Sequence, residues 1–146
     1  MKLLFIILAL ALPGVSIACS CEYADKDTKF EDFKSLVSSF RSADSVVLAH
    51  ALSESTTEGF QTTTFVVETT WKGDHANKFQ TNVATSCCMC GYHFNEGESY
   101  LLYLWKYSGG KYYYTSSCSR TKKKSNAKDE IDTLNRIMPN KGSHAD

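Results

Sequence analysis

The residues with the clearest chemical potential are Cys19, Ser20 and Cys21, which stand directly after an apolar leader. If the leader is removed before Cys19, this residue carries its α-amino nitrogen, carbonyl oxygen and sulfur at the chain terminus. An α-amine has a pKa of about 7.7 to 8.0, against about 10.4 for a lysine amine, so it loses its proton more easily near neutral pH. The amine and the carbonyl oxygen of Cys19 can then form a five-membered chelate ring on a metal ion with an open coordination position.

Residues 1–18 have the pattern of a secretory signal peptide. Lys2 precedes the apolar run Leu3–Leu12, and the small residues Ser16 and Ala18 fit a cleavage site at the end of the segment. The run is shorter than the roughly 20 residues that a transmembrane helix needs. We therefore expect a secreted, extracellular protein without a transmembrane segment; an uncleaved signal anchor is the alternative.

The six cysteines all follow this leader: Cys19, Cys21, Cys87, Cys88, Cys90 and Cys118. An even number of cysteines in an exported chain indicates disulfides, although spacing alone does not choose among the possible pairings. Cys19 and Cys21 are too close together to pair easily in an extended chain, so we expect both to reach the later cysteines. A thiolate site for a soft metal is the alternative, and an oxidising compartment argues against it.

Length and charge indicate one domain of modest size. We expect residues 19–138 to form this domain and residues 139–146, from Pro139 onwards, to be a disordered tail. The 16 Lys and Arg residues balance 16 Asp and Glu residues, which argues against a nucleic-acid partner. We interpret the basic run Arg120–Lys124 as a solvated loop rather than a polyanion site.

Hydrophobic periodicity predicts a helix near each end of this domain. The first covers 28–41, where Phe30, Phe33, Val37 and Phe40 recur at helical spacing and are interpreted as core residues. Thr28 and Glu31 form a capping box at its start. The second covers 125–138, with Ala127, Ile131, Leu134 and Ile137 on one face and Pro139 as its stop.

Alternation of apolar and polar residues predicts five strands between the helices. They lie at Val46–Leu48 with Leu52, Phe65–Trp71, Phe79–Val83, Tyr100–Tyr107 and Lys111–Ser117. The fourth is apolar on both faces, and Ser108–Gly110 predicts a hairpin turn to the fifth. The expected fold is mainly β with flanking helices, a five-stranded Greek-key barrel of the OB type, because closure removes exposed strand edges. A small β-sandwich fits the same periodicity.

Several segments, in their order along the chain, resemble the netrin-like (NTR) module. They are C-S-C at the leader's end, A-D-S-V-V-L-A-H-A-L, a strand ending W-K-G, C-G-Y-H-F-N-E-G-E-S-Y-L-L-Y and T-S-S-C-S-R-T. The chain most closely resembles the inhibitory N-terminal domain of the tissue inhibitors of metalloproteinases, over about Cys19 to Arg120. That family has a five-stranded OB barrel flanked by helices.

The resemblance also implies a disulfide pattern. It pairs Cys19 with Cys90 and Cys21 with Cys118. The family's third bridge, from the first helix to a cysteine after the barrel, has no counterpart in this sequence. The family's additional cysteine-rich C-terminal domain is likewise absent, and Cys87 and Cys88 are extra, so their pairing is unassigned.

The function that the resemblance implies is inhibition of a secreted zinc endopeptidase of the matrix metalloproteinase type by a monomeric chain. Cys19 chelates the catalytic zinc of the protease through its amine and carbonyl, and Ser20 enters the specificity pocket. Cys21 is part of the same protease-contacting wedge, and Cys88 and Met89 form its second edge. The zinc belongs to the protease, so the chain needs no cofactor of its own.

The residues leave other interpretations open. A non-inhibitory NTR binding module would use the cysteines for structure alone. A lipoprotein would carry an acyl group on the Cys19 amine, although lipoprotein signals usually have Leu where this chain has Ser16. An enzyme is not expected, because the histidines lack metal-binding spacing. His50 is interpreted as a hydrogen-bonded strand residue, and Tyr112–Tyr114 as packing residues.

Overall fold

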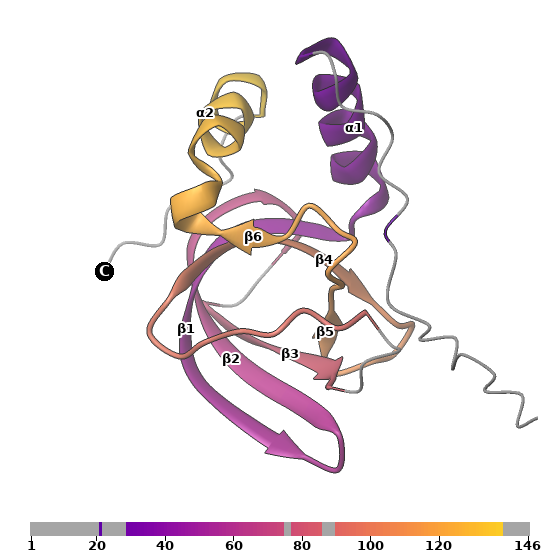
Figure 1. The fold of residues 1–146 in the computed structure, drawn as a ribbon, viewed down its shortest axis with the longest axis vertical. Coiled ribbons are helices and arrows are strands. Elements are labelled where there is room, and N and C mark those ends of the chain that lie inside the picture. Colours follow the sequence, from indigo (N-terminus) through magenta and orange to yellow (C-terminus); the bar gives the residue numbers. More distant parts are fainter. Residues whose placement is uncertain (1–20, 22–28, 75–76, 86–89, 139–146) are drawn as a thin grey trace, which may run out of the picture.

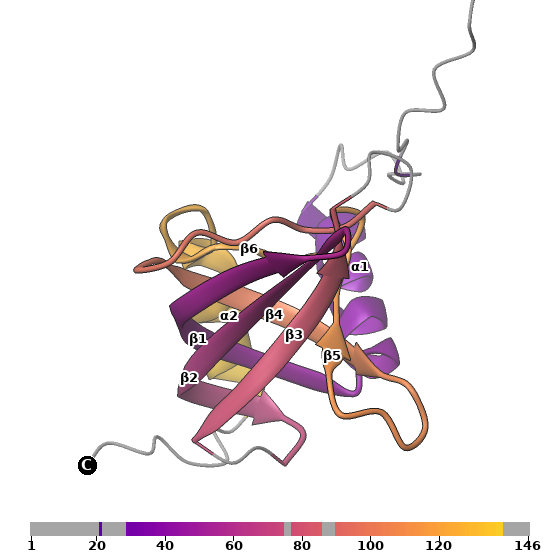
Figure 2. The same cartoon turned by 90° about the horizontal axis from the view of Figure 1, so that it is seen from below.

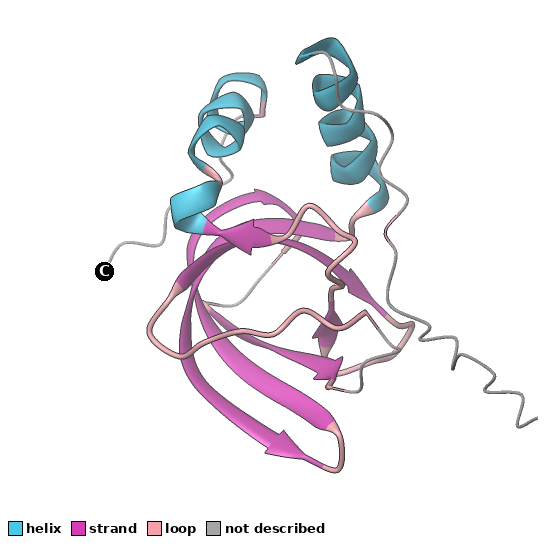
Figure 3. Ribbon diagram, in the orientation of Figure 1, coloured by secondary structure: helices cyan, strands magenta, loops and turns pink. Residues whose placement is uncertain are grey.

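The structure, a computed structural model, describes residues 21, 29–74, 77–85 and 90–138 of the chain. It is mainly β, with one helix before the strands and one after them (Figure 3). The elements are α1 (Lys29–Ser42), β1 (Ser45–Thr57), β2 (Phe60–Lys72), β3 (Lys78–Ala84), β4 (Ser99–Lys106), β5 (Tyr113–Tyr114), β6 (Lys122–Lys123), a 3₁₀ turn (Lys124–Asn126) and α2 (Lys128–Ile137). The predicted order of helices and strands is confirmed, and β6 is an additional short strand.

Five of the strands form a ring. β1 pairs antiparallel with both β2 and β4, β2 pairs with β3, and β5 pairs with β3 and β4. β6 adds to the ring through a further pairing with β4. Figure 1 shows both helices on one side of this ring and the tip of the β1–β2 hairpin at the opposite end, and Figure 2 shows the same ring turned by 90°.

Two hydrophobic cores lie on the two faces of the sheet. The inner core contains Phe65, Phe94 and Tyr100, and the outer core contains Leu36 of α1 and Leu134 of α2. Alternate residues of β1 and β4 contribute to both cores, so these strands are buried on both faces. This double burial explains the near-continuous apolar sequence of β4, as predicted.

The β1–β2 hairpin is longer than predicted. It continues to a turn at Glu58 and Gly59, which both have positive φ, as a tight hairpin turn requires. The outer part of β1, Ser53–Thr57, is exposed and polar. Hydrophobic alternation marks the strand where it meets the core, but the hydrogen-bonded ladder continues beyond that point. The sequence pattern therefore underestimated its length.

β5 is shorter than the predicted strand Lys111–Ser117. The turn before it is confirmed, because the Gly110 N–H donates to the Tyr107 carbonyl at 2.7 Å and Gly109 has φ of 72°. Tyr113 packs against the inner core as predicted, whereas Tyr112 is exposed. Tyr114 packs on Tyr107 with 4.6 Å between ring centroids.

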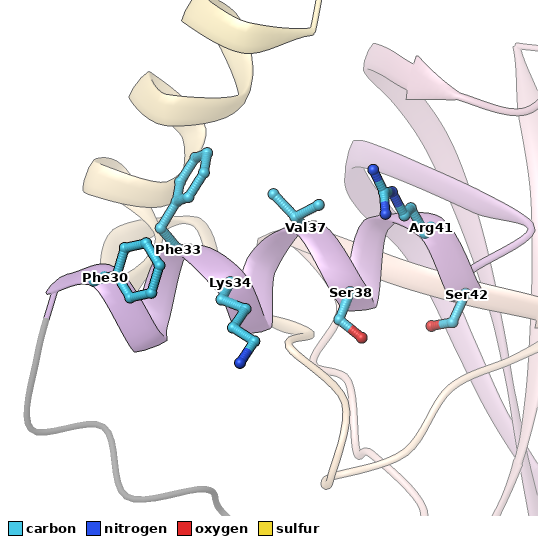
Figure 4. Close-up of a pocket in the computed structure, with 7 residues that line it drawn as sticks. All are labelled: Phe30, Phe33, Lys34, Val37, Ser38, Arg41 and Ser42. Atoms are coloured by element: carbon cyan, nitrogen blue, oxygen red, sulfur yellow. The ribbon is translucent and has the colours of Figure 1, made fainter.

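The interpretation of the phenylalanine stripe as core was wrong for its first half. Phe30 is 71% exposed and Phe33 is 43% exposed, whereas Phe40 packs against the outer core. The reason is geometric: α1 extends beyond the sheet, so residues near its start have no strand beneath them (Figure 1). Figure 4 shows Phe33 and Val37 on one side of α1 and Lys34 on the other.

The last turn of α1 is held by the W-K-G segment at the end of β2. The Lys72 ammonium donates to the carbonyls of Phe40 and Arg41, at 2.9 and 2.8 Å, and also to that of Ala43. These are carbonyls that a helix C-terminus leaves without intrahelical partners, and a cation there also complements the helix dipole. Lys72 therefore fixes the direction in which α1 leaves the sheet.

α2 buries the predicted face in part. Ala127 and Leu134 are buried and Ile131 packs against the outer core, but Ile137 at the end of the helix is 39% exposed.

Among the described residues, no helix is long and apolar enough to span a membrane.

Candidate functional site

A disulfide between Cys21 and Cys118 joins the start of the described chain to the segment that follows β5. The two residues are 97 positions apart in sequence, and their Cα atoms are 5.0 Å apart. This is the pair that the family resemblance implies. Cys118 is exposed and Cys21 is partly exposed, so the bridge lies at the surface, where another protein could reach it.

The turn that carries Cys118 is held by hydroxyl groups of the T-S-S-C-S-R-T segment. The Ser119 N–H and hydroxyl both donate to the Ser116 carbonyl, at 3.0 and 2.7 Å. The buried Thr115 hydroxyl lies 2.9 Å from that of Ser119 and 2.8 Å from that of Thr121. Thr121 in turn accepts a hydrogen bond from the backbone N–H of Tyr103 in β4. The hydroxyl groups therefore fix the Cys118 turn to the ring.

Cys90 lies directly beside this turn. Its carbonyl accepts hydrogen bonds from the Ser117 N–H at 2.8 Å and the Ser117 hydroxyl at 3.2 Å, and Gly91 forms a β-bridge with Ser116. Cys90 has φ of 49° and is itself disulfide-bonded. Two disulfide-bonded cysteines, Cys90 and Cys118, thus come together from segments that are distant in sequence.

Gly91 allows this close approach. A Cβ at this position would lie 2.1 Å from the Ala84 carbonyl oxygen, well inside any real contact distance. No larger residue fits unless the backbone moves. The C-G pair therefore has a structural reason: the chain must pass directly against the end of β3 at the point where it reaches the Cys118 turn.

The residues after Gly91 anchor the segment in the inner core. Phe94 is buried, and Tyr92 packs against Phe94 and Tyr100. The Gln61 side chain bonds both backbone groups of Phe94, accepting from its N–H and donating to its carbonyl, each at 3.0 Å. Sequence reasoning missed Gln61, because a single polar residue in an alternating strand gives no signal of a partner 33 residues away.

Arg120 ties the Cys118 turn to both helices, so the prediction of a solvated loop at Arg120–Lys124 was wrong. Its guanidinium donates to both carboxylate oxygens of Glu130, at 2.9 and 2.7 Å, and to Asp32 of α1 at 2.9 Å. The Arg120 side chain is 9% exposed and that of Glu130 is 5% exposed. Sequence gave no sign of this arrangement, because both acidic partners are on other elements.

The electrostatics of this cluster follow from burial and pairing. Burial alone would lower the pKa of Arg120, but its hydrogen bonds to Glu130 and Asp32 outweigh burial and raise it. Burial alone would raise the pKa of Glu130, but hydrogen bonds from Arg120, Lys122 and Tyr103 lower it. Both groups are therefore charged at neutral pH, and their ion pair stabilises the contact between the Cys118 turn and α2.

The other residues of the basic run are also paired. Lys122 bonds Glu130 at 2.8 Å, Lys123 bonds Glu98 at 2.7 Å and Lys124 bonds Glu68 at 2.7 Å. The run therefore presents little free positive charge. These side chains are therefore held by carboxylates, which solvation of the run would not require.

His50 is a hydrogen-bonded strand residue, as predicted. Its Nδ1 lies 3.2 Å from the Ser99 hydroxyl, and that hydroxyl donates to Glu68 at 2.6 Å. In a nucleophile–base pair the serine would donate to the histidine instead. His50, Ser99 and Glu68 therefore form a hydrogen-bonded chain that links β1, β4 and β2. In this arrangement Ser99 is not activated as a nucleophile, because its hydroxyl donates to Glu68.

The structure brings together Cys21, Cys90 and Cys118 among the residues predicted for the site. Cys19, Ser20, Cys87, Cys88 and Met89 lie outside the described residues, so their roles and the Cys19–Cys90 pairing stay predictions. Within the described ranges, no group of three or more His, Cys, Asp or Glu residues could hold a metal ion.

Comparison with protein-family models and with curated proteins finds no match for this chain.

Proposed function

We propose that this protein is a secreted inhibitor of a zinc metalloendopeptidase that acts through a free N-terminal Cys19. The observation that carries the proposal is the position of Cys21. Its disulfide to Cys118 holds the residue two positions after Cys19 on a turn that is hydrogen-bonded to Cys90. Cys118 is exposed and Cys21 is partly exposed, so we infer that Cys19 is presented at the surface beside this bridge.

Rigidity beside this bridge favours tight binding. A segment that is already ordered loses little conformational entropy when it enters a protease cleft. The Cys118 turn is held by the hydroxyls of Thr115, Ser119 and Thr121, and Arg120 ties it to α1 and α2. A Cys19–Cys90 bridge would add a second tether beside the same turn.

The proposed chemistry is chelation. A catalytic zinc site keeps one coordination position for the water that attacks the peptide bond. The α-amine and carbonyl oxygen of Cys19 displace this water, and the amine loses its proton at modest cost because its pKa is about 7.7 to 8.0. Ser20 then enters the specificity pocket, and Cys88 and Met89 contact the protease at the second edge of the wedge.

The proposal includes the finer fold assignment. We infer that the ring of five strands is a Greek-key OB barrel and that the chain is an NTR domain resembling the tissue inhibitors of metalloproteinases. The closed pairing of β1 with both β2 and β4 supports this inference. The Arg120 ion pairs link α1 to the segment after β5, which offsets the absence of the family's third disulfide.

The first test is an inhibition titration against a panel of matrix-type zinc endopeptidases. It compares protein that begins at Cys19 with the same protein carrying one extra Ala before Cys19. We expect stoichiometric inhibition by the first and loss of at least about a hundredfold in affinity with the second, because the added residue removes the amine from the chelate. A third protein, with the extra Ala at its C-terminus, controls for the added residue.

The outcomes separate the alternatives. Equal inhibition by all three proteins would overturn the chelate mechanism. Absence of inhibition by the protein that begins at Cys19, once mass spectrometry has shown its amine to be unmodified, would favour a non-inhibitory NTR binding module. An acyl group on Cys19 in secreted protein would favour a lipid-anchored form.

A further inference from the structure

Helix α1 carries large apolar side chains that the rest of the fold leaves uncovered. Phe30 is 71% exposed, Phe33 is 43% exposed, and Val37 is only partly buried against the outer core. A shallow groove of about 630 Å³ runs along this side of the helix (Figure 4). A contiguous apolar surface of this kind is typical of a protein-binding site. We call it the α1 face and define it by six lining residues: Phe30, Phe33, Val37, Ser38, Arg41 and Ser42.

The side chains of the α1 face form two rows along the helix. Phe33 and Val37 are four residues apart in one row, and the other row starts at Phe30 and ends at Ser38 and Ser42. Rows at this spacing are the ridges that pack into the grooves of a second helix. The large side chains belong to the first half of the helix, and the small ones belong to the second half. An antiparallel helix of the same sequence would therefore place its rings against the serines.

The charges of α1 follow the same order along the helix. Glu31 lies in the first turn and Arg41 lies in the last turn. Glu31 precedes Ser38 by seven residues, so it flanks the α1 face on the side of the serines. The Glu31 carboxylate lies 4.0 Å from the Lys34 ammonium, but both side chains are exposed, so this pair contributes little. Within the described part of the chain, Arg41 forms no ion pair with a carboxylate.

We propose that the α1 face binds the α1 face of a second copy of this chain. An antiparallel pair about a two-fold axis brings Glu31 of each copy opposite Arg41 of the other, and Phe30 opposite Ser42. A two-fold interface needs a surface that is complementary to itself. The α1 face meets this requirement in both the charge and the size of its side chains, which favours a second copy over an unrelated protein.

The composition of α1 disfavours a membrane surface as the partner. Helices that lie on membranes have a polar face rich in Lys and Arg. In α1, three basic residues stand against two acidic ones, and the two serines occupy the second half of the α1 face. The helix therefore lacks the excess of positive charge that anionic lipids attract.

The size of the α1 face predicts a weak, reversible dimer. Its six residues are far fewer than the roughly 20 to 30 that each partner contributes to a stable interface. We expect a dissociation constant of about 100 μM, so the chain is a monomer when dilute and dimerises as its concentration rises. The proposed protease inhibition neither requires nor excludes this dimer.

The first test is sedimentation equilibrium of the full chain, expressed with its leader in a secretory host, from about 10 μM to about 1 mM. Two charge reversals, E31K and R41E, each place like charges opposite one another in the dimer. We expect each variant to associate at least about fivefold more weakly than the parent protein. An equimolar mixture of the two variants should recover the parent affinity, because both opposite-charge pairs form again between unlike chains.

Matched variants separate this contact from general effects of charge and folding. E96K and K78E reverse exposed charges outside α1. Each should change the association by less than about twofold, and their mixture should gain nothing. F30Q removes a ring that is already 71% exposed, so it should weaken association at least about fivefold and leave the urea midpoint unchanged.

Two NMR measurements on the unmodified protein do not depend on the folding of a variant. Amide signals of residues 30–42 should shift as the protein is diluted from about 1 mM. In a mixture of isotope-labelled and unlabelled chains, filtered NOEs should connect the Phe30 ring to the β-protons of Ser42 in the other copy. Vesicles of phosphatidylcholine and phosphatidylserine should not bind the protein.

Several results would overturn the proposal. They are a monomer at every concentration, a dimer that survives denaturation without reductant, equal losses in the charge reversals and their controls, no recovery in the mixture of E31K and R41E, or NMR shifts confined to residues outside α1. Vesicle binding that F30Q abolishes would assign the α1 face to a membrane instead. All of these outcomes are independent of protease inhibition, so the failure of either proposal leaves the other standing.

Discussion

Single residues determine how closely the segments of the candidate site approach one another. Gly91 passes so near the Ala84 carbonyl that a side chain has no room, and Cys90 before it takes a left-handed backbone conformation. Cys90 also accepts the hydrogen bonds of Ser117. The orientation of the Cys90 disulfide therefore depends on a residue that does no chemistry itself.

The substitution Gly91→Ala tests this dependence. We expect it to lower the free energy of unfolding by about 2 kcal/mol or more, because the backbone must shift to relieve the overlap with Ala84. Urea unfolding with disulfides intact measures the change. Gly97→Ala is the matched control: Gly97 has positive φ but open space around it, so only backbone strain of about 1 kcal/mol is expected. A Gly91→Ala loss no larger than the control's would contradict the close-approach argument.

At the scale of elements, Glu130 connects α2 to three other parts of the fold. It accepts from Arg120 next to the Cys118 turn, from Lys122 of β6 and from the Tyr103 hydroxyl of β4. Arg120 also reaches Asp32 of α1. A single carboxylate therefore sets the position of both helices relative to the turn that carries the disulfide.

We expect Glu130→Gln to lower the free energy of unfolding by about 3 kcal/mol at neutral pH, because it leaves the buried Arg120 without its main counter-charge. Glu98→Gln, which removes the exposed partner of Lys123, should change it much less. Urea unfolding of the two variants and the parent protein measures both effects. Equal losses in the two variants would show that Glu130 has no special role.

The same carboxylate predicts a pH dependence. The pKa of Glu130 is lowered from its ordinary value of 4.5, so its stabilisation is complete above that value and is lost as the pH falls through the lowered pKa. The parent protein should therefore lose more stability than Glu130→Gln between about pH 5 and about pH 2. Urea unfolding across this range gives the two slopes, and parallel slopes would contradict the prediction.

At the scale of the whole molecule, the Cys21–Cys118 bridge and the strand ring stabilise different parts of the protein. The ring has its own inner core, built from Phe65, Phe94 and Tyr100 among others, and the bridge lies outside it. The bridge instead ties the start of the chain to a segment 97 residues later. Its loss should therefore release the N-terminal segment and leave the ring assembled.

The double variant C21S/C118S tests this division. By loop-closure entropy, a bridge across 97 residues contributes about 4 to 5 kcal/mol, so we expect the urea midpoint to fall strongly. Near-UV circular dichroism of the inner core should be retained below that midpoint. The proposed protease inhibition should fall, because Cys21 would no longer be tied to the Cys118 turn. A loss of the near-UV signal without denaturant would mean that the ring depends on the bridge.

The sequence by itself determined the types and order of the elements. Helical spacing located α1 and α2, and the apolar run from Tyr100 identified β4 as buried on both faces. It also indicated disulfides, and the family resemblance singled out the pair Cys21 and Cys118 that the structure joins. These features are local or compositional, because periodicity records which side of an element meets apolar surroundings.

Only the tertiary structure decided which distant groups meet. It paired Arg120 with Glu130 and Asp32, matched Gln61 to Phe94, and left Phe30 and Phe33 exposed where α1 extends past the sheet. It also places a cleft of about 490 Å³ beside the single pairing between β3 and β5. The physical reason is that partner choice depends on how the ring closes and where each element ends, and a one-dimensional pattern of apolar and charged residues does not record either.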